Sequence, residues 1–344
     1  MDKWVRVQTS WYSRQFHLKS LLVIAILLTI TVLIACASLA LGKYPLSAMA
    51  LVQALGSRDI AENAFIVQIL RMPRMLMAFM TGSALAVAGL LFQTMVRNSL
   101  ASPDVMGVTG GASAAAVWFI TAGASSISAF WLPPVAMAGG MIGGGLVYLL
   151  GRKDKLSSTR LILTGIGVAA IMTAITTMQL VFSPPSSVMS AYVWLIGSLY
   201  GARWHEVQAL LIWLSPAAIV LVWLARSLQV NELDESLGTG LGIDVKRMRL
   251  ILLFLGVYLA GAAIAYAGAL SFVGLISPHL ARRLVHRPGP ELIFVTALTG
   301  GTLVMSADLM GRVAFQPLDL PAGIFISAVG APYFLYLLLR ARIS

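Results

Sequence analysis

The sequence predicts an all-α, polytopic membrane protein with about ten transmembrane helices and an inverted internal repeat. Hydrophobic residues make up 59% of the 344 residues and charged residues only 11%. The mean hydropathy is +0.88. A water-soluble globule of this length needs far more polar surface. Apolar runs of about twenty residues, the length that crosses a bilayer, recur along the chain. We therefore treat residues 1–344 as a single transmembrane domain.

The apolar runs place the spans in order. They lie at Leu21–Leu41, Met75–Met95, Met106–Ala122, Ala129–Leu150, Leu161–Phe182, Val207–Ala225, Leu250–Ala267, Ala269–Val285, Leu292–Leu309 and Ala322–Leu339. The first run has bilayer length rather than signal-peptide length, which indicates a retained span. The amphipathic stretch Val188–Leu199 is too short to cross. We expect it to form a helix at the outer face or dipping part-way into the membrane.

Lysine and arginine give the orientation. With the N-terminus inside and ten crossings, eighteen of the twenty-four basic residues fall on the inner side, as the positive-inside rule requires, and both termini are cytoplasmic. This bias explains most of the net charge of +11 without a nucleic acid partner. The outward exceptions are Lys43, Arg58, Arg71, Arg74, Arg203 and Arg312.

The sequence argues against several kinds of chemistry. The acidic residues fall in loops or at span ends, whereas ion-coupled carriers commonly place an ionisable group at depth. No G-x-x-x-x-G-K-[ST] phosphate loop is present, so any ATP hydrolysis belongs to a partner subunit and this chain is not expected to be an enzyme. Cys36 is the single cysteine and His279 has no second ligand at i+4, so we expect no metal site, no cofactor and no catalytic residue.

Two short segments resemble each other. GSALAVAG at Gly82–Gly89 matches GAAIAYAG at Gly261–Gly268. The second copy lies five spans after the first, and an odd offset reverses its direction through the membrane, as in the inverted repeats of transporters. Small-residue stripes that let helices approach closely would explain the same similarity without a repeat.

The longest polar interruption, Ser227–Arg249, is predicted to be cytoplasmic. Asn231 can cap a helix whose first turn contains Glu232, Asp234 and Glu235. Three glycines then break this helix before a basic second segment. Two short helices lying across the inner surface fit this pattern, and a solvated loop is the alternative.

Four ordered motifs carry a family resemblance. They are RMPRMLMAFMTGSALAVAGLLFQTMVRNSLASPDVMGVTGGAS (Arg71–Ser113), LGTGLGIDV (Leu237–Val245), FVGLISPHLARRLV (Phe272–Val285) and DLPAGIFISAVGAPYFLYLLLR (Asp319–Arg340). The chain resembles the permease subunits of bacterial binding-protein-dependent ABC importers for ferric siderophores, haem and cobalamin. It departs from the common pattern at Ser99, where proline usually follows the asparagine, and at Ser277, where valine or isoleucine often precedes Pro278.

The resemblance implies an assembly in the bacterial cell membrane. Its parts are a homodimer or paralogous heterodimer of permeases, two cytosolic ABC ATPases and an extracytoplasmic binding (lipo)protein. The chelate would move inward by alternating access. An ion-coupled secondary transporter or a channel that does not use ATP is the alternative, and the sequence does not identify the chelate.

The resemblance also assigns roles to residues. It implies that Arg71, Arg74 and Arg312 dock to glutamates of the binding protein, and guanidinium groups suit such bidentate pairing. Interfacial anchors that snorkel to lipid headgroups are the alternative. Ser158 and Thr159 would lie at the cytoplasmic gate, where helix capping is the other possible role. ATPase coupling would rest on Glu232, Asp234, Glu235, Leu237, Gly238, Gly240 and Gly242.

Overall fold

Each of the ten predicted apolar segments contains a helix. The structure, a computed structural model, describes residues 4–9, 12–56, 62–123, 127–151, 158–225, 245–285 and 289–341. Its elements are β1 (Trp4–Thr9), β2 (Tyr12–His17), α1 (Leu18–Ala40), α2 (Ala48–Gly56), α3 (Glu62–Ala64), η1 (Phe65–Arg71), α4 (Met72–Val96), α5 (Val108–Trp118), η2 (Phe119–Gly123), η3 (Ala129–Trp131), α6 (Leu132–Gly151), α7 (Ser158–Val181), α8 (Pro185–Ile196), α9 (Trp204–Leu224), α12 (Val245–Ala267), α13 (Val273–Leu284), α14 (Pro290–Val313) and α15 (Ala322–Ala341).

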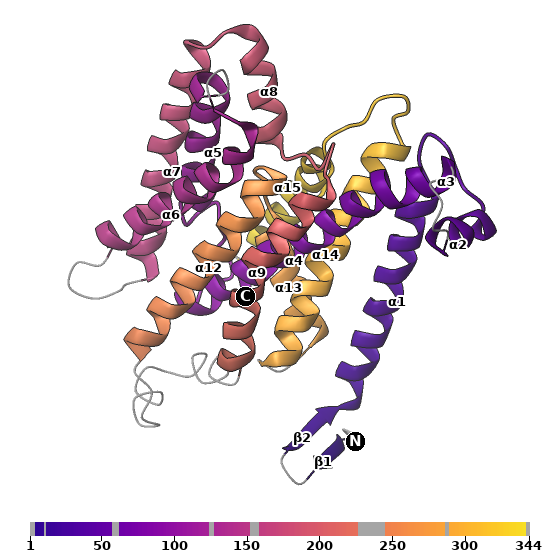
Figure 1. Cartoon of the computed structure of the whole chain (residues 1–344). Coiled ribbons are helices and arrows are strands. Elements are labelled where there is room, and N and C mark those ends of the chain that lie inside the picture. Colours follow the sequence, from indigo (N-terminus) through magenta and orange to yellow (C-terminus); the bar gives the residue numbers. More distant parts are fainter. Residues whose placement is uncertain are drawn as a thin grey trace.

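The long helices form a bundle, and a β-hairpin precedes it (Figure 1). Among the described residues, seven helical segments are long and apolar enough to cross a membrane. The apolar helices at Val108–Ala122 and Ala322–Leu337 are shorter. These findings confirm a polytopic helical membrane protein. The hairpin was not predicted, because its alternating residues precede the first apolar run.

The eighth predicted span differs from its expected length. Only α13 is helical there, and its 12 residues reach about 18 Å at 1.5 Å per residue, against a hydrocarbon core of about 30 Å. The helix is interrupted because Gly268 and Phe272 adopt left-handed backbone conformations, with φ values of 73° and 65°. Glycine tolerates this conformation readily, whereas Phe272 adopts it at an energetic cost.

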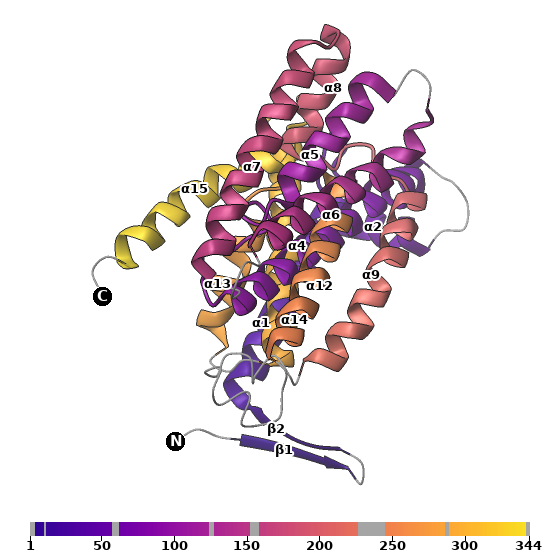
Figure 2. The same cartoon turned by 90° about the vertical axis from the view of Figure 1, so that its left-hand side faces the viewer.

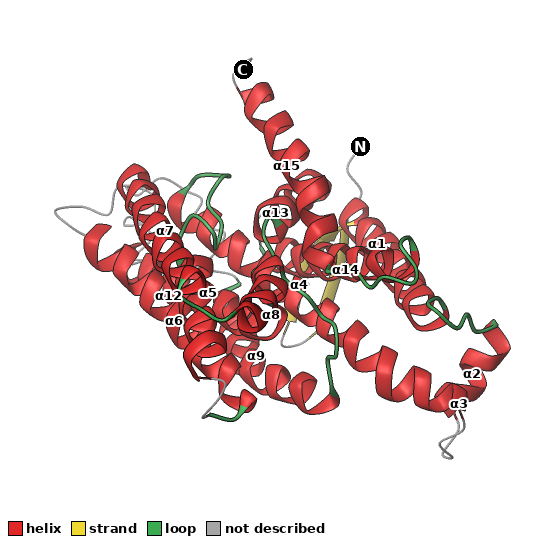
Figure 3. Ribbon diagram, turned by 90° about the horizontal axis from the view of Figure 1, so that it is seen from above, coloured by secondary structure: helices red, strands yellow, loops and turns green. Residues whose placement is uncertain are grey.

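The two halves of the chain interlock. Helix α4, from the first half, packs against α13 and α14, from the second half. Helix α12 packs correspondingly against α5 and α6, and α4 contacts α12 directly. Figure 3 shows α4 in the middle of the bundle, with α12 beside α5 and α6. This exchange of equivalent contacts is what an inverted repeat predicts.

The glycines of the first repeat copy allow α4 to approach its neighbours closely. A Cβ added at Gly82 would collide with the carbonyl oxygen of Gly300 in α14, and one added at Gly89 with that of Gly274 in α13. These are backbone atoms of packed helices, so they cannot move aside cheaply. The stripe therefore has a packing role, whether or not it also marks a repeat.

Replacing Gly89 with valine is expected to destabilise the subunit by about 1–3 kcal/mol or more, because overpacking must push α13 away from α4. Gly145→Val is the matched control, since no atom lies within 4 Å of a Cβ added at Gly145 in α6. Thermal unfolding in detergent measures the difference. Equal unfolding temperatures for the two variants would contradict the close α4–α13 contact.

Candidate functional site

One end of the bundle holds a cluster of five charged residues. We call it the arginine cluster, and its members are Arg71, Arg74, Asp308, Arg312 and Asp319. The structure thus brings together the three arginines predicted for docking. They come from the end of η1, the first turn of α4 and the last turn of α14, while Asp319 lies just before α15.

Arg74 is at the centre of this cluster. Its Nε and Nη2 lie 2.8 Å from Oδ1 of Asp308. Its Nη1 donates to Oδ2 of Asp319 at 2.6 Å, and Nη2 donates to Oδ1 of Asp319 at 2.8 Å. This pairing is the planar, bidentate one to which arginine is suited. Arg74 is 8% exposed and Asp308 is 1% exposed, so the Arg74–Asp308 pair is a buried one.

The other two arginines bind the C-terminal end of α1. Arg71 donates through Nη1 to the carbonyl oxygens of Leu39 (2.7 Å) and Ala40 (3.0 Å). Arg312 donates through Nη2 to the carbonyl and hydroxyl oxygens of Ser38, at 3.1 and 2.7 Å. The last carbonyls of a helix lack partners within it and carry partial negative charge. Two arginines therefore cap α1 and fix it to η1 and α14.

These contacts bear on the docking prediction without testing it. The lipid-anchor alternative fits poorly, because the arginine side chains are buried in protein rather than extended along its surface. Docking remains a prediction, and Asp319, with a side chain 31% exposed, is an accessible member of the cluster. Sequence reasoning missed both acidic partners. The i,i+4 spacing of Asp308 and Arg312 was the available signal.

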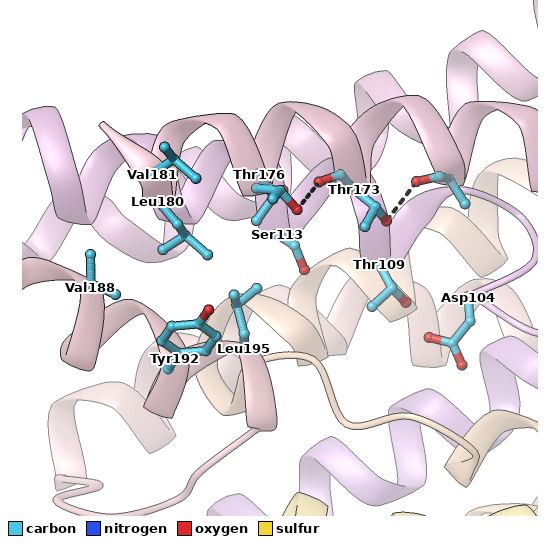
Figure 4. A pocket seen from close by; sticks show the side chains of 13 residues that line it. Asp104, Thr109, Ser113, Thr173, Thr176, Leu180, Val181, Val188, Tyr192 and Leu195 are labelled. Carbon is cyan, nitrogen blue, oxygen red and sulfur yellow. Dashed lines mark hydrogen bonds between the residues drawn. The ribbon is translucent and has the colours of Figure 1, made fainter. Parts of the chain in front are cut away.

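A second candidate site is a cavity of about 650 Å³ between α5, α7 and α8 (Figure 4). Four aliphatic side chains line one part of it: Leu180, Val181, Val188 and Leu195. Six hydroxyl-bearing residues also line it: Thr109, Ser113, Thr173, Thr176, Thr177 and Tyr192. Such a surface offers a ligand many weak polar contacts beside a single ionisable carboxyl group, that of Asp104.

The threonines of α7 present mainly acceptor atoms to this cavity. Thr173 donates its hydroxyl hydrogen to the carbonyl of Ala169 at 2.9 Å (Figure 4), and Thr176 donates to that of Met172 at 2.8 Å. A hydroxyl used in this way keeps lone pairs that can accept a further hydrogen bond. The α7 side of the cavity therefore favours ligands or waters that donate hydrogen bonds.

Asp104 lies at one end of the cavity, where the segment after α4 turns back into the bundle (Figure 4). Pro103 lies against Gly274 of α13, and the carbonyl of Val105 lies against Gly165 of α7. The Asp104 carboxyl group interacts with the side chain of Thr109 and the backbone N–H of Phe272. We had expected acidic residues only in loops and at span ends. Asp104 is indeed in a loop, but this loop is packed among helices.

The structure does not test the residues predicted for the cytoplasmic gate and for ATPase coupling. Ser158 is the first residue of α7, and Thr159, which follows it, is exposed. The gate prediction and its helix-capping alternative both stay untested. The predicted coupling residues Glu232, Asp234, Glu235, Leu237, Gly238, Gly240 and Gly242 fall in residues 226–244, outside the described residues.

Interlocked halves of apolar helices, with a hydroxyl-lined cavity between three of them, define a multi-pass membrane transport protein. The sequence matches the FecCD transport family over residues 28–340, which is most of the chain. The chain belongs to this family.

Curated relatives and a solved structure agree with this assignment. The chain is 49% identical over 331 residues to the achromobactin transport system permease protein CbrC of Dickeya dadantii, covering 96% of this chain and 95% of that protein. It is 36% identical over 330 residues to the iron(3+)-hydroxamate import system permease protein FhuG of Bacillus subtilis, covering 94% and 98%. A metal-chelate type ABC transporter in an inward-facing conformation superposes with a TM-score of 0.81 at 27% identity, covering 92% and 99%.

Proposed function

We propose that this protein is the permease subunit of an ATP-driven importer that moves a ferric siderophore, or a chelate of similar size, into the cytoplasm. The observation that carries the proposal is the family match over residues 28–340, together with near full-length relatives named for achromobactin and iron-hydroxamate transport. ATP would be hydrolysed by separate subunits. The two interlocked halves would rock against each other to open the path alternately to either side.

The proposal includes three protein partners. Cytosolic ATPases would bind the segment between α9 and α12, which lies on the side predicted to be cytoplasmic. A second permease subunit, identical or paralogous, would complete the path. An extracytoplasmic binding protein would dock at the end of the bundle that holds the arginine cluster. The complex would lie in the bacterial cell membrane, with both termini of this chain in the cytoplasm.

The position of Asp104 is the observation that favours the alternative function, an ion-coupled secondary transporter. A carboxylate inside the bundle beside a cavity is a feature expected of ion-coupled carriers. In that alternative the chain would transport without ATP. The interactions of Asp104 with Thr109 and the backbone of Phe272 give it a structural role as well, so its presence does not require ion coupling.

Reconstitution separates the two functions. The permease would be placed in proteoliposomes with candidate ATPase and binding-protein subunits, and uptake of ⁵⁵Fe-citrate and of a ⁵⁵Fe-trihydroxamate would be measured. We expect uptake of at least one chelate only with ATP on the ATPase side. An ATPase variant that lacks the phosphate-loop lysine is the control. Uptake driven by a proton or sodium gradient without the ATPase would overturn the proposal.

Coupling can be tested in the same system. Gly240→Pro or Leu237→Asp is expected to reduce ATP-dependent uptake at least about tenfold, because a distorted or charged segment would no longer seat in the ATPase. Membrane insertion should be unchanged, as measured by the yield of purified permease. Leu237→Met, which keeps size and polarity, is the matched control. Normal uptake by Gly240→Pro and Leu237→Asp would remove residues 226–244 from the coupling interface.

A further inference from the structure

An open groove of about 430 Å³ runs between α9 and α12, and it shares no lining residue with the arginine cluster or the hydroxyl-lined cavity. Figure 2 shows the two helices side by side, with α9 at the right-hand edge of the bundle. Pro216, Ala217 and Val220 of α9 form one wall. The α12 wall consists of Arg247, Leu250, Ile251, Phe254, Leu255 and Tyr258. These positions recur at intervals of three and four, so they lie on one face of α12.

One end of the groove is positively charged. Arg247 is exposed and is the first residue of the candidate span Arg247–Ala267, which places it at the edge of the apolar layer. The first turn of α12 contains no acidic residue, and Arg249 follows two positions after Arg247. The N-terminal end of a helix also carries partial positive charge. This end of the groove therefore attracts an anion.

At the other end of the groove, the polar groups already bond to one another. Tyr258 donates its hydroxyl hydrogen to the carbonyl of Trp213 at 2.8 Å, and the two rings lie 6.3 Å apart. Pro216 has no N–H to donate to the carbonyl of Ile212, and the hydroxyl of Ser215 donates to it instead, at 3.0 Å. A ligand at this end therefore needs no hydrogen-bonding group, which suits a hydrocarbon chain.

The length of the groove matches the depth of one leaflet. Tyr258 lies eleven positions after Arg247 in α12, which is about 16 Å at 1.5 Å per residue, and half of a hydrocarbon core of about 30 Å is about 15 Å. The charged end thus lies at the membrane surface and the apolar end near the midplane. Arg247 belongs to the segment Ser227–Arg249 that is predicted to be cytoplasmic, so this leaflet is the inner one.

We propose that this groove binds one anionic phospholipid of the inner leaflet, with its phosphate paired to Arg247 and an acyl chain lying along Val220 and Phe254. Basic pockets between transmembrane helices on the cytoplasmic side bind anionic headgroups, and a guanidinium pairs with a phosphate through two hydrogen bonds. A polar chelate fits the groove less well, because its hydrogen-bonding groups would lie unpaired against an apolar wall.

Native mass spectrometry of the full-length permease tests the proposal, because one spectrum counts bound lipids and gives the oligomeric state. Dioleoyl phosphatidylglycerol and dioleoyl phosphatidylcholine would each be titrated into the detergent-purified protein. We expect one phosphatidylglycerol to bind at least about fivefold more tightly than phosphatidylcholine, since one basic residue at the membrane surface contributes about that factor. Arg247→Gln should remove this preference. Arg249→Gln is the matched control, because Arg249 does not line the groove, and it should keep the preference.

The apolar wall has its own pair of variants. Val220→Trp should weaken binding of both lipids at least about fivefold, because the indole ring would displace part of the acyl chain. Val222→Trp, on the same helix, 78% exposed and outside the groove, should bind lipid normally.

Two results would overturn the proposal. The first is equal affinity for the two lipids, or a preference for phosphatidylglycerol that survives in Arg247→Gln. The second is a change from dimer to monomer in Val220→Trp with lipid binding unchanged, which would assign the groove to an interface between permease subunits.

Discussion

Replacing Arg74 with alanine is expected to destabilise the detergent-solubilised subunit by about 3–5 kcal/mol. The substitution removes three hydrogen bonds and leaves Asp308, which is 1% exposed, with Arg312 as its remaining ion-pair partner. Breaking a buried ion pair by removing one member is costly because the other charge stays away from water. The measurement is the unfolding temperature of the purified subunit.

Lys43→Ala is the control for the loss of a positive charge at the same end of α1, because Lys43 is exposed. It should change stability little. Asp319→Asn should have an intermediate effect, since that side chain is 31% exposed and water can replace part of the lost interaction. If Arg74→Ala were as stable as Lys43→Ala, the cluster would not support the fold.

The stability of the Arg74 variants determines how docking of the binding protein can be tested. The charge reversals Arg71→Glu and Arg74→Glu would place new carboxylates beside Asp308, Asp319 and the C-terminal carbonyls of α1. Loss of binding-protein-stimulated ATPase activity then supports docking only if the unfolding temperature is unchanged. Stimulation retained at physiological salt would confine these arginines to their intramolecular contacts.

The second large effect is expected at Thr173, whose side chain borders the hydroxyl-lined cavity. Thr173→Trp should reduce chelate uptake in proteoliposomes at least about tenfold, because an indole ring would narrow the cavity of about 650 Å³ between α5, α7 and α8. Thr173 is exposed in the subunit, so the unfolding temperature should change little. The measurements are ⁵⁵Fe-chelate uptake and the unfolding temperature.

Conservative substitutions at the same position control this experiment. Thr173→Ser keeps the hydroxyl that donates to the carbonyl of Ala169, and Thr173→Val keeps the shape without the hydroxyl. Both should transport within a few-fold of the unsubstituted protein if size is the decisive factor. Full uptake by Thr173→Trp would show that the chelate does not pass this cavity.

Hydrophobic pattern and charge bias predicted the helices well, because both are local properties of the sequence. Every long apolar run became a helix, and even the short segment near Val188 formed α8. What the pattern did not predict depends on contacts between distant residues. Arg74 and Asp319 are 245 positions apart, and nothing in either neighbourhood indicates the other.

The same limitation explains two other differences. Asp104 lies in a polar-looking connection, and only the packing of Pro103 against Gly274 shows that this connection enters the bundle. The sequence places the boundary between the seventh and eighth spans at Gly268, but the left-handed conformation of Phe272 has no sequence signal. The coupling residues stay a prediction, since they lie outside the described residues.

The exchange of partners between the two halves has a consequence for biosynthesis. Helix α4 is made early, yet Asp308, which pairs with Arg74, follows 234 residues later. At a synthesis rate of about 5–20 residues per second, the ribosome adds Asp308 roughly 12–47 seconds after Arg74. The glycine faces of α4 likewise have no packing partner until α13 and α14 have been synthesised. The first five spans are thus a nascent intermediate rather than an autonomous unit, and the insertion machinery must hold them until the ribosome has delivered the second half.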